Sequence, residues 1–405
     1  MDKIDLIFLN ILKSALKGEK RTGCDFLTEE EWARIFETAE KHSLLPLIYN
    51  ASYSRRKIRD SRAIRNRVRR LVTLQTVKTD KFLRLYKKLT DAGCMPIVVK
   101  GLVLRRLYPN PDLRMSSDED ILAERRQFDD CLRIMSDFGL NCNMTEGETK
   151  TVHEVSFKSD DGILYIELHK SLFPPDSAAY GNMNDLFIGA ADRAIMSDGV
   201  YTLCPTDHII YLICHALKHF IHSGFGIRQV CDITMFANEY GNEIDWQRVF
   251  DSCQSISRRT FAATIFAIGE KHLTFDRERA KIPDYFCARA ADETDLLADL
   301  LSAGVFGGAT ESRKHSANMT LDAISQNSKG KTAAKSLKST LFPSADSLKK
   351  RYRYLKKSSL LLPIAWVQRF FTYIKNSGSN GNTRAEAVKL GGERISLLRE
   401  YNIIK

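Results

Sequence analysis

Residues 95–122, MPIVVKGLVLRRLYPNPDLRMSSDEDIL, contain the pattern that decides the fold. The β-branched run that ends at Gly101 predicts a buried strand and then a turn, and residues 102–108 continue as a helix. Residues 114–122 predict a second strand, which carries Asp118 and Asp120. Because side chains alternate along a strand, both aspartates project from one side, about 7 Å apart, with Glu119 on the other.

A third carboxylate stands in the next predicted pair of strands. Residues 153–158 and 163–169 are joined by an SDDG sequence, which favours a hairpin turn. Alternation places Glu167 on the polar face of the second of these strands. If that strand neighbours the first acidic strand, three carboxylates converge, and their repulsion then requires a cation. We therefore predict that Asp118, Asp120 and Glu167 are the catalytic carboxylates and bind Mg²⁺ or Mn²⁺, which prefer oxygen ligands.

Several residues around the acidic strand suit a phosphate group. Gly101 would let a phosphate approach the backbone at a helix start, where free amides favour anions, and Lys100 adds a positive charge beside it. Arg114, Ser116 and Ser117 precede the aspartates and are expected to contact phosphate oxygens or a second substrate. The alternative is that Gly101 is only a strand-to-helix turn and Lys100 a solvent-exposed residue.

Four histidines lie near one stripe of a helix predicted for residues 207–222, namely His208, His215, His219 and His222. Zinc binding is one interpretation, although the Glu that follows the first His of a metalloprotease helix is missing here. The interpretation that we favour places His215 and His219 against the sheet, where they orient substrate.

Three other polar residues are interpreted from their spacing and neighbours. Arg228 and Asp232 stand one helical turn apart and are expected to form an ion pair. His169 is expected to contact substrate or to support a ligand, because a carboxylate or a metal-bound hydroxide can serve as the base.

The sequence around this core is helical, so the predicted fold class is α+β: a small mixed β-sheet flanked by helices, with helical N-terminal and C-terminal regions. The predicted organisation is a helical region at 1–90, a core at 91–200, a helical bundle at 201–303, a flexible linker at 304–340 and C-terminal helices at 341–405. Thr28 begins a capped helix. Further helices are predicted at 72–89, 128–138, 227–240, 246–269, 344–356, 363–375 and 384–401.

Composition narrows the class of protein. The 405 residues carry a net charge of +11, concentrated at 55–70 and 329–357, which fits either solvated helix faces or a surface for a polyanion such as RNA. Nine scattered cysteines without a Cys-x-x-Cys pair suggest reduced thiols, and no apolar run approaches the length of a membrane span. We expect a cytoplasmic protein. The P-loop, dinucleotide-binding and serine-hydrolase motifs are absent, which excludes those classes.

The runs VVKGLVLRRLYP at 98–109, LRMSSDEDIL at 113–122 and IELH at 166–169 resemble the uncharacterised nucleotidyltransferase family of the polymerase-β superfamily. The likeness covers about residues 30–260. It implies that Gly101, Asp118, Asp120 and Glu167 fill the superfamily's site positions, whereas Leu102 stands where the superfamily has a Ser that touches a phosphate.

The resemblance also implies a reaction. A nucleoside monophosphate would pass from an NTP to a hydroxyl acceptor, which the resemblance does not identify as a small molecule, peptide or RNA. Two alternatives stay open: a catalytically inactive binding or scaffold protein, for which Leu102 would be a first sign, and an RNA-modifying or toxin–antitoxin component.

Overall fold

The computed structural model of the protein describes residues 1–20, 24, 26–52, 61–175, 177, 180–222, 224–255, 258–303, 361–366, 368 and 382–401. The predicted linker at 304–340 and the predicted helix at 344–356 lie outside the described residues, as does most of the helix predicted at 363–375.

A seven-stranded mixed sheet forms the centre of the described structure, in the order β3-β4-β5-β2-β1-β7-β6. The central strand β2 is antiparallel to β1 and parallel to β5, and β4 and β5 form the predicted hairpin. The protein therefore has the predicted α+β fold. The strands are β1 (Ile97–Val98), β2 (Glu119–Leu122), β3 (Leu140–Asn141), β4 (Glu154–Ser159), β5 (Tyr165–His169), β6 (Ile195–Ser197) and β7 (Val200–Thr202).

Two of the strands are shorter than the sequence pattern predicts. The strand predicted at 95–101 has only two residues in the ladder, and the strand predicted at 114–122 begins at Glu119. The reason is that the preceding residues bond elsewhere: Arg114 and Leu113 close a turn that begins with η1 (Pro111–Leu113). As a consequence, Asp118 stands just before β2 and Asp120 stands within it.

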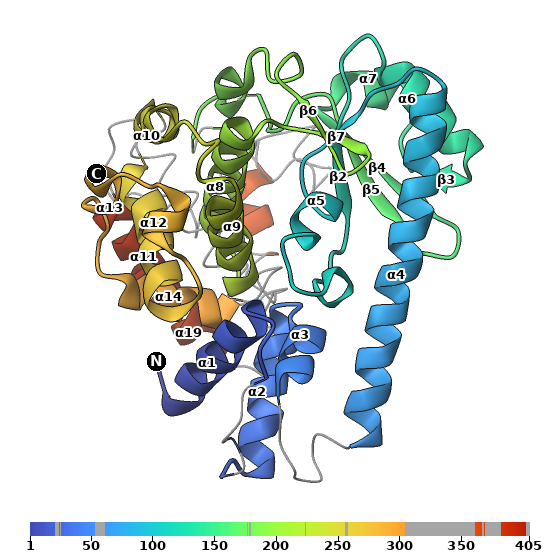
Figure 1. Ribbon diagram of the computed structural model, residues 1–405. Coiled ribbons are helices and arrows are strands. Elements are labelled where there is room, and N and C mark those ends of the chain that lie inside the picture. Colours follow the sequence, from blue (N-terminus) through green and yellow to red (C-terminus); the bar gives the residue numbers. More distant parts are fainter. Residues whose placement is uncertain are drawn as a thin grey trace.

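One face of the sheet packs against α4 (Arg62–Asp91) and α6 (Phe128–Asp137), which lie on the same side of it in Figure 1. The apolar side chains that alternate along the strands, such as Val98, Ile121 and Leu168, join Phe82 of α4 in a buried core. This burial fixes the register, because a shift by one residue would turn the polar side chains into the core.

The opposite face meets the helical bundle that begins with α8 (Pro205–His222) and α9 (Ile227–Tyr240). In Figure 1 these two helices separate the sheet from the rest of the bundle. The other helices of the second and larger core are α1 (Lys3–Leu16), α2 (Glu29–Lys41), α3 (Leu45–Ala51), α10 (Trp246–Ser255), α11 (Arg259–His272), α12 (Arg277–Ala280), α13 (Asp284–Cys287), α14 (Glu293–Ala303) and α19 (Asn382–Glu400).

On the described residues the helix predictions hold with three differences, the first being that the helix predicted at 102–108 ends at Arg105. Residues 246–269, predicted as one helix, form α10 and α11, and the helix predicted at 72–89 is part of the longer α4. The predicted capped start at Thr28 is confirmed, since its hydroxyl accepts from the Glu31 amide. None of the nine cysteines, all of which lie on described residues, forms a disulfide bond. Among the described residues, no helix has the length and apolar content that crossing a bilayer requires.

Candidate functional site

The site begins with the pairing of β2 and β5. These strands are parallel, and Asp120 and Glu167 are direct register partners. Ile121 and Ile166 face the core under α4, so alternation directs Asp120 and Glu167 to the opposite face, toward the bundle. The structure thus brings together two carboxylates that are 47 positions apart in the sequence.

His169 completes a group with these two carboxylates. One ligand atom from each of Asp120, Glu167 and His169 lies within 4.8 Å of the others. Among the described residues, these three side chains form the group whose spacing suits a metal ion. His169 Nε2 is 3.4 Å from Asp120 Oδ1 and 3.8 Å from Glu167 Oε2. Asp118 is outside this group: its Oδ1 accepts a hydrogen bond from the Ser117 hydroxyl at 2.9 Å.

Lys100 supplies the positive charge of the site. Its Nζ lies 2.8 Å from Asp120 Oδ2 and 4.0 Å from Asp118 Oδ1, so it is not a solvent-exposed residue. Burial by itself would lower the pKa of Lys100, but Asp118 and Asp120 raise it above its ordinary value. In the same way, burial by itself would raise the pKa of Asp120, and Lys100 with His169 holds it well below the ordinary range.

Glu167 has the opposite electrostatic environment. Burial, followed by the charges of Asp120 and Asp118, raises the pKa of Glu167 to about 7. One lysine therefore does not neutralise the negative charge of the site. A divalent cation would relieve this repulsion, and the donor set of carboxylate oxygens and an imidazole fits such an ion.

Gly101 allows another carboxylate to come close from the far side of the turn. Its φ is +56°, and a Cβ added there would lie 1.8 Å from Glu119 Oε2. Glu119 accepts a hydrogen bond from the Leu102 amide at 2.8 Å and forms a buried ion pair with Arg105. The amide at the start of α5 (Leu102–Arg105) is thus already occupied, which corrects the expectation that it is free for a phosphate.

The residues before Asp118 are held from α4. Lys78 Nζ donates to the carbonyl oxygens of Ser116, at 2.7 Å, and Ser117, and the Ser116 amide donates to Gln75 Oε1 at 2.9 Å. Burial lowers the pKa of Lys78 to about 8. The Ser116 hydroxyl donates to Glu119, so it belongs to the buried network rather than to the open face.

Arg114 is also held by a buried partner. Its Nε and Nη2 donate to Asp232 of α9 at 3.0 and 2.7 Å, and Tyr108 donates to the same carboxylate. The expected pair of Arg228 with Asp232 is therefore wrong, because Arg228 instead donates to the Met115 carbonyl. Sequence spacing could not reveal this, since Arg114 and Asp232 are brought together only by the fold.

The histidines of α8 divide into two groups. His215 Nε2 lies 3.5 Å from Lys100 Nζ and 3.2 Å from His219 Nε2, so these two face the sheet. Burial, followed by the charge of Lys100, lowers the pKa of His215. The same two causes lower the pKa of His219 to about 3. His208 instead contacts the Val99 carbonyl at 2.8 Å. The described histidines of α8 are in no group with the spacing of metal ligands, so the zinc interpretation finds no support.

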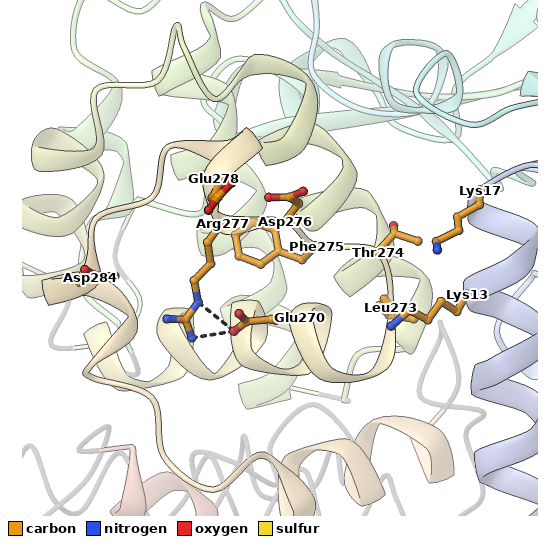
Figure 2. Close-up of a pocket in the computed structure, with 10 residues that line it drawn as sticks. All are labelled: Lys13, Lys17, Glu270, Leu273, Thr274, Phe275, Asp276, Arg277, Glu278 and Asp284. Carbon is orange, nitrogen blue, oxygen red and sulfur yellow. Dashed lines mark hydrogen bonds and ion pairs between the residues drawn. The ribbon is translucent and has the colours of Figure 1, made fainter.

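A separate cleft of about 600 Å³ lies between α1 and the segment from α11 to α13. Figure 2 shows its charged lining, in which Arg277 pairs with Glu270 at 2.6 Å. It contains none of the candidate residues: its lining consists of Lys13, Lys17, Glu270, Leu273, Thr274, Phe275, Asp276, Arg277, Glu278 and Asp284.

A comparison with known protein families finds one that is described as "Uncharacterised nucleotidyltransferase", whose model matches residues 28–273. The match begins at the cap of α2 and ends just after α11, so it contains the whole sheet and the site. No curated protein and no solved structure matches the chain significantly.

Proposed function

Because the chain belongs to the uncharacterised nucleotidyltransferase family, we propose that its β2–β5 site transfers a nucleoside monophosphate from an NTP to a hydroxyl acceptor, with pyrophosphate leaving. One observation carries the proposal: Asp120 and Glu167 are register partners on neighbouring strands and face the bundle together. Carboxylates paired in this way are suited to bind the metal that phosphoryl chemistry requires.

Asp118, Asp120 and Glu167 would hold a divalent cation, Mg²⁺ or Mn²⁺. The raised pKa of Glu167 supports this assignment, because after burial its causes are the negative charges of Asp120 and Asp118, which a cation would offset. When bound, the cation supplies activation of the attacking hydroxyl and neutralisation of the leaving pyrophosphate.

Lys100 and Ser117 are the proposed phosphate contacts. The Lys100 ammonium lies between Asp118 and Asp120, and the Ser117 hydroxyl lies next to Asp118. In our proposal both groups also bind a phosphate oxygen of the NTP. Arg114 and Ser116 have donors committed to buried carboxylates, so in our proposal they position the loop before Asp118. Gly101 lets that network close.

His215 and His219 are proposed to line the acceptor side of the site. Both rings are kept neutral by burial and by Lys100. A neutral imidazole can donate and accept hydrogen bonds, which suits it to orient a hydroxyl without adding charge.

The proposal is tested by thermal unfolding of the full chain with each NTP, with and without Mg²⁺ or Mn²⁺. We expect a metal-dependent rise in melting temperature that Asp120→Asn abolishes. Asp91→Asn is the matched control, because Asp91 lies exposed at the end of α4, where it pairs with Lys87. Transfer is then followed with α-³²P-labelled NTPs and candidate acceptors, together with release of pyrophosphate.

A binding or scaffold function is the second candidate, and one observation favours it. The Leu102 amide is occupied by Glu119, and Leu102 has no hydroxyl for a phosphate. If no NTP shifts the melting temperature with either metal, the transferase proposal fails and the scaffold function is preferred.

A further inference from the structure

We propose that His169 is itself a metal ligand through Nε2, with Glu154 orienting its ring, and that this nitrogen makes the site prefer first-row transition ions such as Mn²⁺ over Mg²⁺. The inference rests on the proposed function only in placing a metal on β2 and β5. It adds an imidazole that the carboxylate assignment does not contain, and a residue, Glu154, that no sequence motif marks.

The first support is the spacing of the ligand atoms. His169 Nε2 lies 3.4 Å from Asp120 Oδ1 and 3.8 Å from Glu167 Oε2. Ligand atoms that bind one ion at about 2.1 Å are about 3 to 4.2 Å from one another, depending on the angle at the metal. The three side chains therefore need little movement to share an ion.

The second support is that the His169 ring makes no well-formed hydrogen bond. The side chain is 5% exposed. Within the described part of the chain, the Asp120 and Glu154 oxygens stand 3.4 and 3.6 Å from its two nitrogens without meeting hydrogen-bond geometry. Burying a polar group without a partner is unfavourable, so such a group in a folded protein calls for an explanation. A metal ion on Nε2 provides one.

Glu154 is the acidic neighbour of the other ring nitrogen, Nδ1. It is the register partner of His169 across β4 and β5, and its Oε2 lies 3.6 Å from His169 Nδ1. Metal-binding histidines generally direct the second nitrogen to a carboxylate, which fixes the tautomer and the ring orientation. The same Glu154 oxygen is 3.2 Å from His153 Nε2, so the carboxylate serves both rings.

Lys100 does not prevent this arrangement, because the two oxygens of Asp120 face different neighbours. Oδ2 is paired with Lys100 at 2.8 Å, and Oδ1 faces His169. Oδ1 can therefore bind an ion while the ion pair on Oδ2 stays intact. With an imidazole added to the carboxylates, the site departs from the all-oxygen set that Mg²⁺ favours.

The test uses Mn²⁺ alone, without nucleotide, on the full chain after removal of any histidine tag. Electron spin-echo envelope modulation detects ¹⁴N coupled to bound Mn²⁺, and an EPR titration gives the affinity. We expect ¹⁴N coupling in the wild type and its loss in His169→Ala, with Mn²⁺ affinity lowered 10-fold or more and Mg²⁺ affinity, measured by competition, lowered less than 3-fold. Glu154→Gln should keep the coupling and weaken Mn²⁺ binding about 10-fold.

His272→Asn is the control, because His272 lies at the end of α11, where its Nε2 is 3.5 Å from Glu293 Oε1; coupling and affinity should be unchanged. Circular dichroism checks that each variant is folded. Bound Mn²⁺ without ¹⁴N coupling, or coupling that persists in His169→Ala, would overturn the inference while leaving nucleotidyl transfer intact. Coupling in a protein that binds no NTP would support the metal site and count against the transferase.

Discussion

At the scale of single residues, Gly101 and Glu119 show how closely the groups pack on the face of β2 opposite to Asp120. The absence of a Cβ at Gly101 lets the Glu119 carboxylate reach the Leu102 amide. Glu119 is fully buried and paired with Arg105, so a buried charged network holds the turn between β1 and α5 in addition to the apolar packing of Leu102 and Val103. Such a network leaves little room for change, because a buried charge without its partner is strongly destabilising.

Gly101→Ala should therefore lower the free energy of unfolding by more than the backbone alone requires. Gly139→Ala is the matched control, since Gly139 also has a positive φ, +90°, but its Cβ would meet nothing within 4 Å. We expect about 1 kcal/mol for Gly139→Ala, from the left-handed backbone, and about 3 kcal/mol or more for Gly101→Ala. Urea unfolding measures both, and equal losses would show that Glu119 moves aside freely.

His208 makes stability depend on pH. Burial lowers the pKa of His208 from 6.5 to about 4, so the unfolded chain binds the proton more readily than the folded one. Stability is then complete above about pH 6.5 and falls as the pH drops toward 4, by up to about 3 kcal/mol from this residue. His208→Gln, which keeps a donor for the Val99 carbonyl, should reduce the slope of unfolding free energy over this range. An unchanged slope would assign the acid sensitivity to other groups.

At the scale of elements, the Arg114–Asp232 pair joins the loop before β2 to α9. Both side chains are buried, and two donors of the guanidinium bind the carboxylate. The pair connects the sheet to the bundle at the point where the acidic residues begin. We infer that the position of Asp118 depends on α9 as well as on β2.

Asp232→Asn should lower the free energy of unfolding by about 3 kcal/mol, because it leaves the Arg114 charge buried without its counter-ion. Glu270→Gln tests the contrast: it breaks the ion pair with Arg277 drawn in Figure 2, where both side chains are 42% exposed, and should cost less than about 1 kcal/mol. Urea unfolding of both variants gives the comparison, and similar losses would contradict the assignment.

At the scale of the whole molecule, the described part of the C-terminal region completes the larger core. Tyr401 lies 6.3 Å from Phe220 and 6.2 Å from Phe261, measured between ring centroids, and Arg394 donates to the Phe220 carbonyl. This region lies beyond residues 28–273, which the family match covers. The bundle that backs the site is therefore finished by residues outside the matched segment.

Tyr401→Ala should lower the free energy of unfolding by about 3 kcal/mol, because it removes a buried ring from between two aromatic neighbours. Tyr401→Phe keeps that ring and is the control. Removal of residues 382–405 should lower the melting temperature further and increase binding of an apolar dye, since it exposes Phe220 and Phe261. Unchanged melting of the truncated chain would show that the core closes without α19.

Much of the local structure followed from the sequence by itself, because it depends on short-range periodicity. Alternation along residues 118–120 and 163–169 was enough to place Asp120 and Glu167 on polar faces and Glu119 on the reverse. The α+β class, the hairpin of β4 and β5 and α9 followed from equally local signals. The chain's similarity to a nucleotidyltransferase family was carried by the same short runs.

Only the tertiary structure decided which charged groups meet. Asp118 falls outside the strand, Asp232 pairs with Arg114 rather than Arg228, and Glu119 occupies the Leu102 amide. Each of these contacts joins different elements, and the choice among possible partners depends on three-dimensional packing and desolvation, on which periodicity carries no information. The place of His169 beside Asp120 was settled in the same way, by the pairing of two strands that the chain itself keeps far apart.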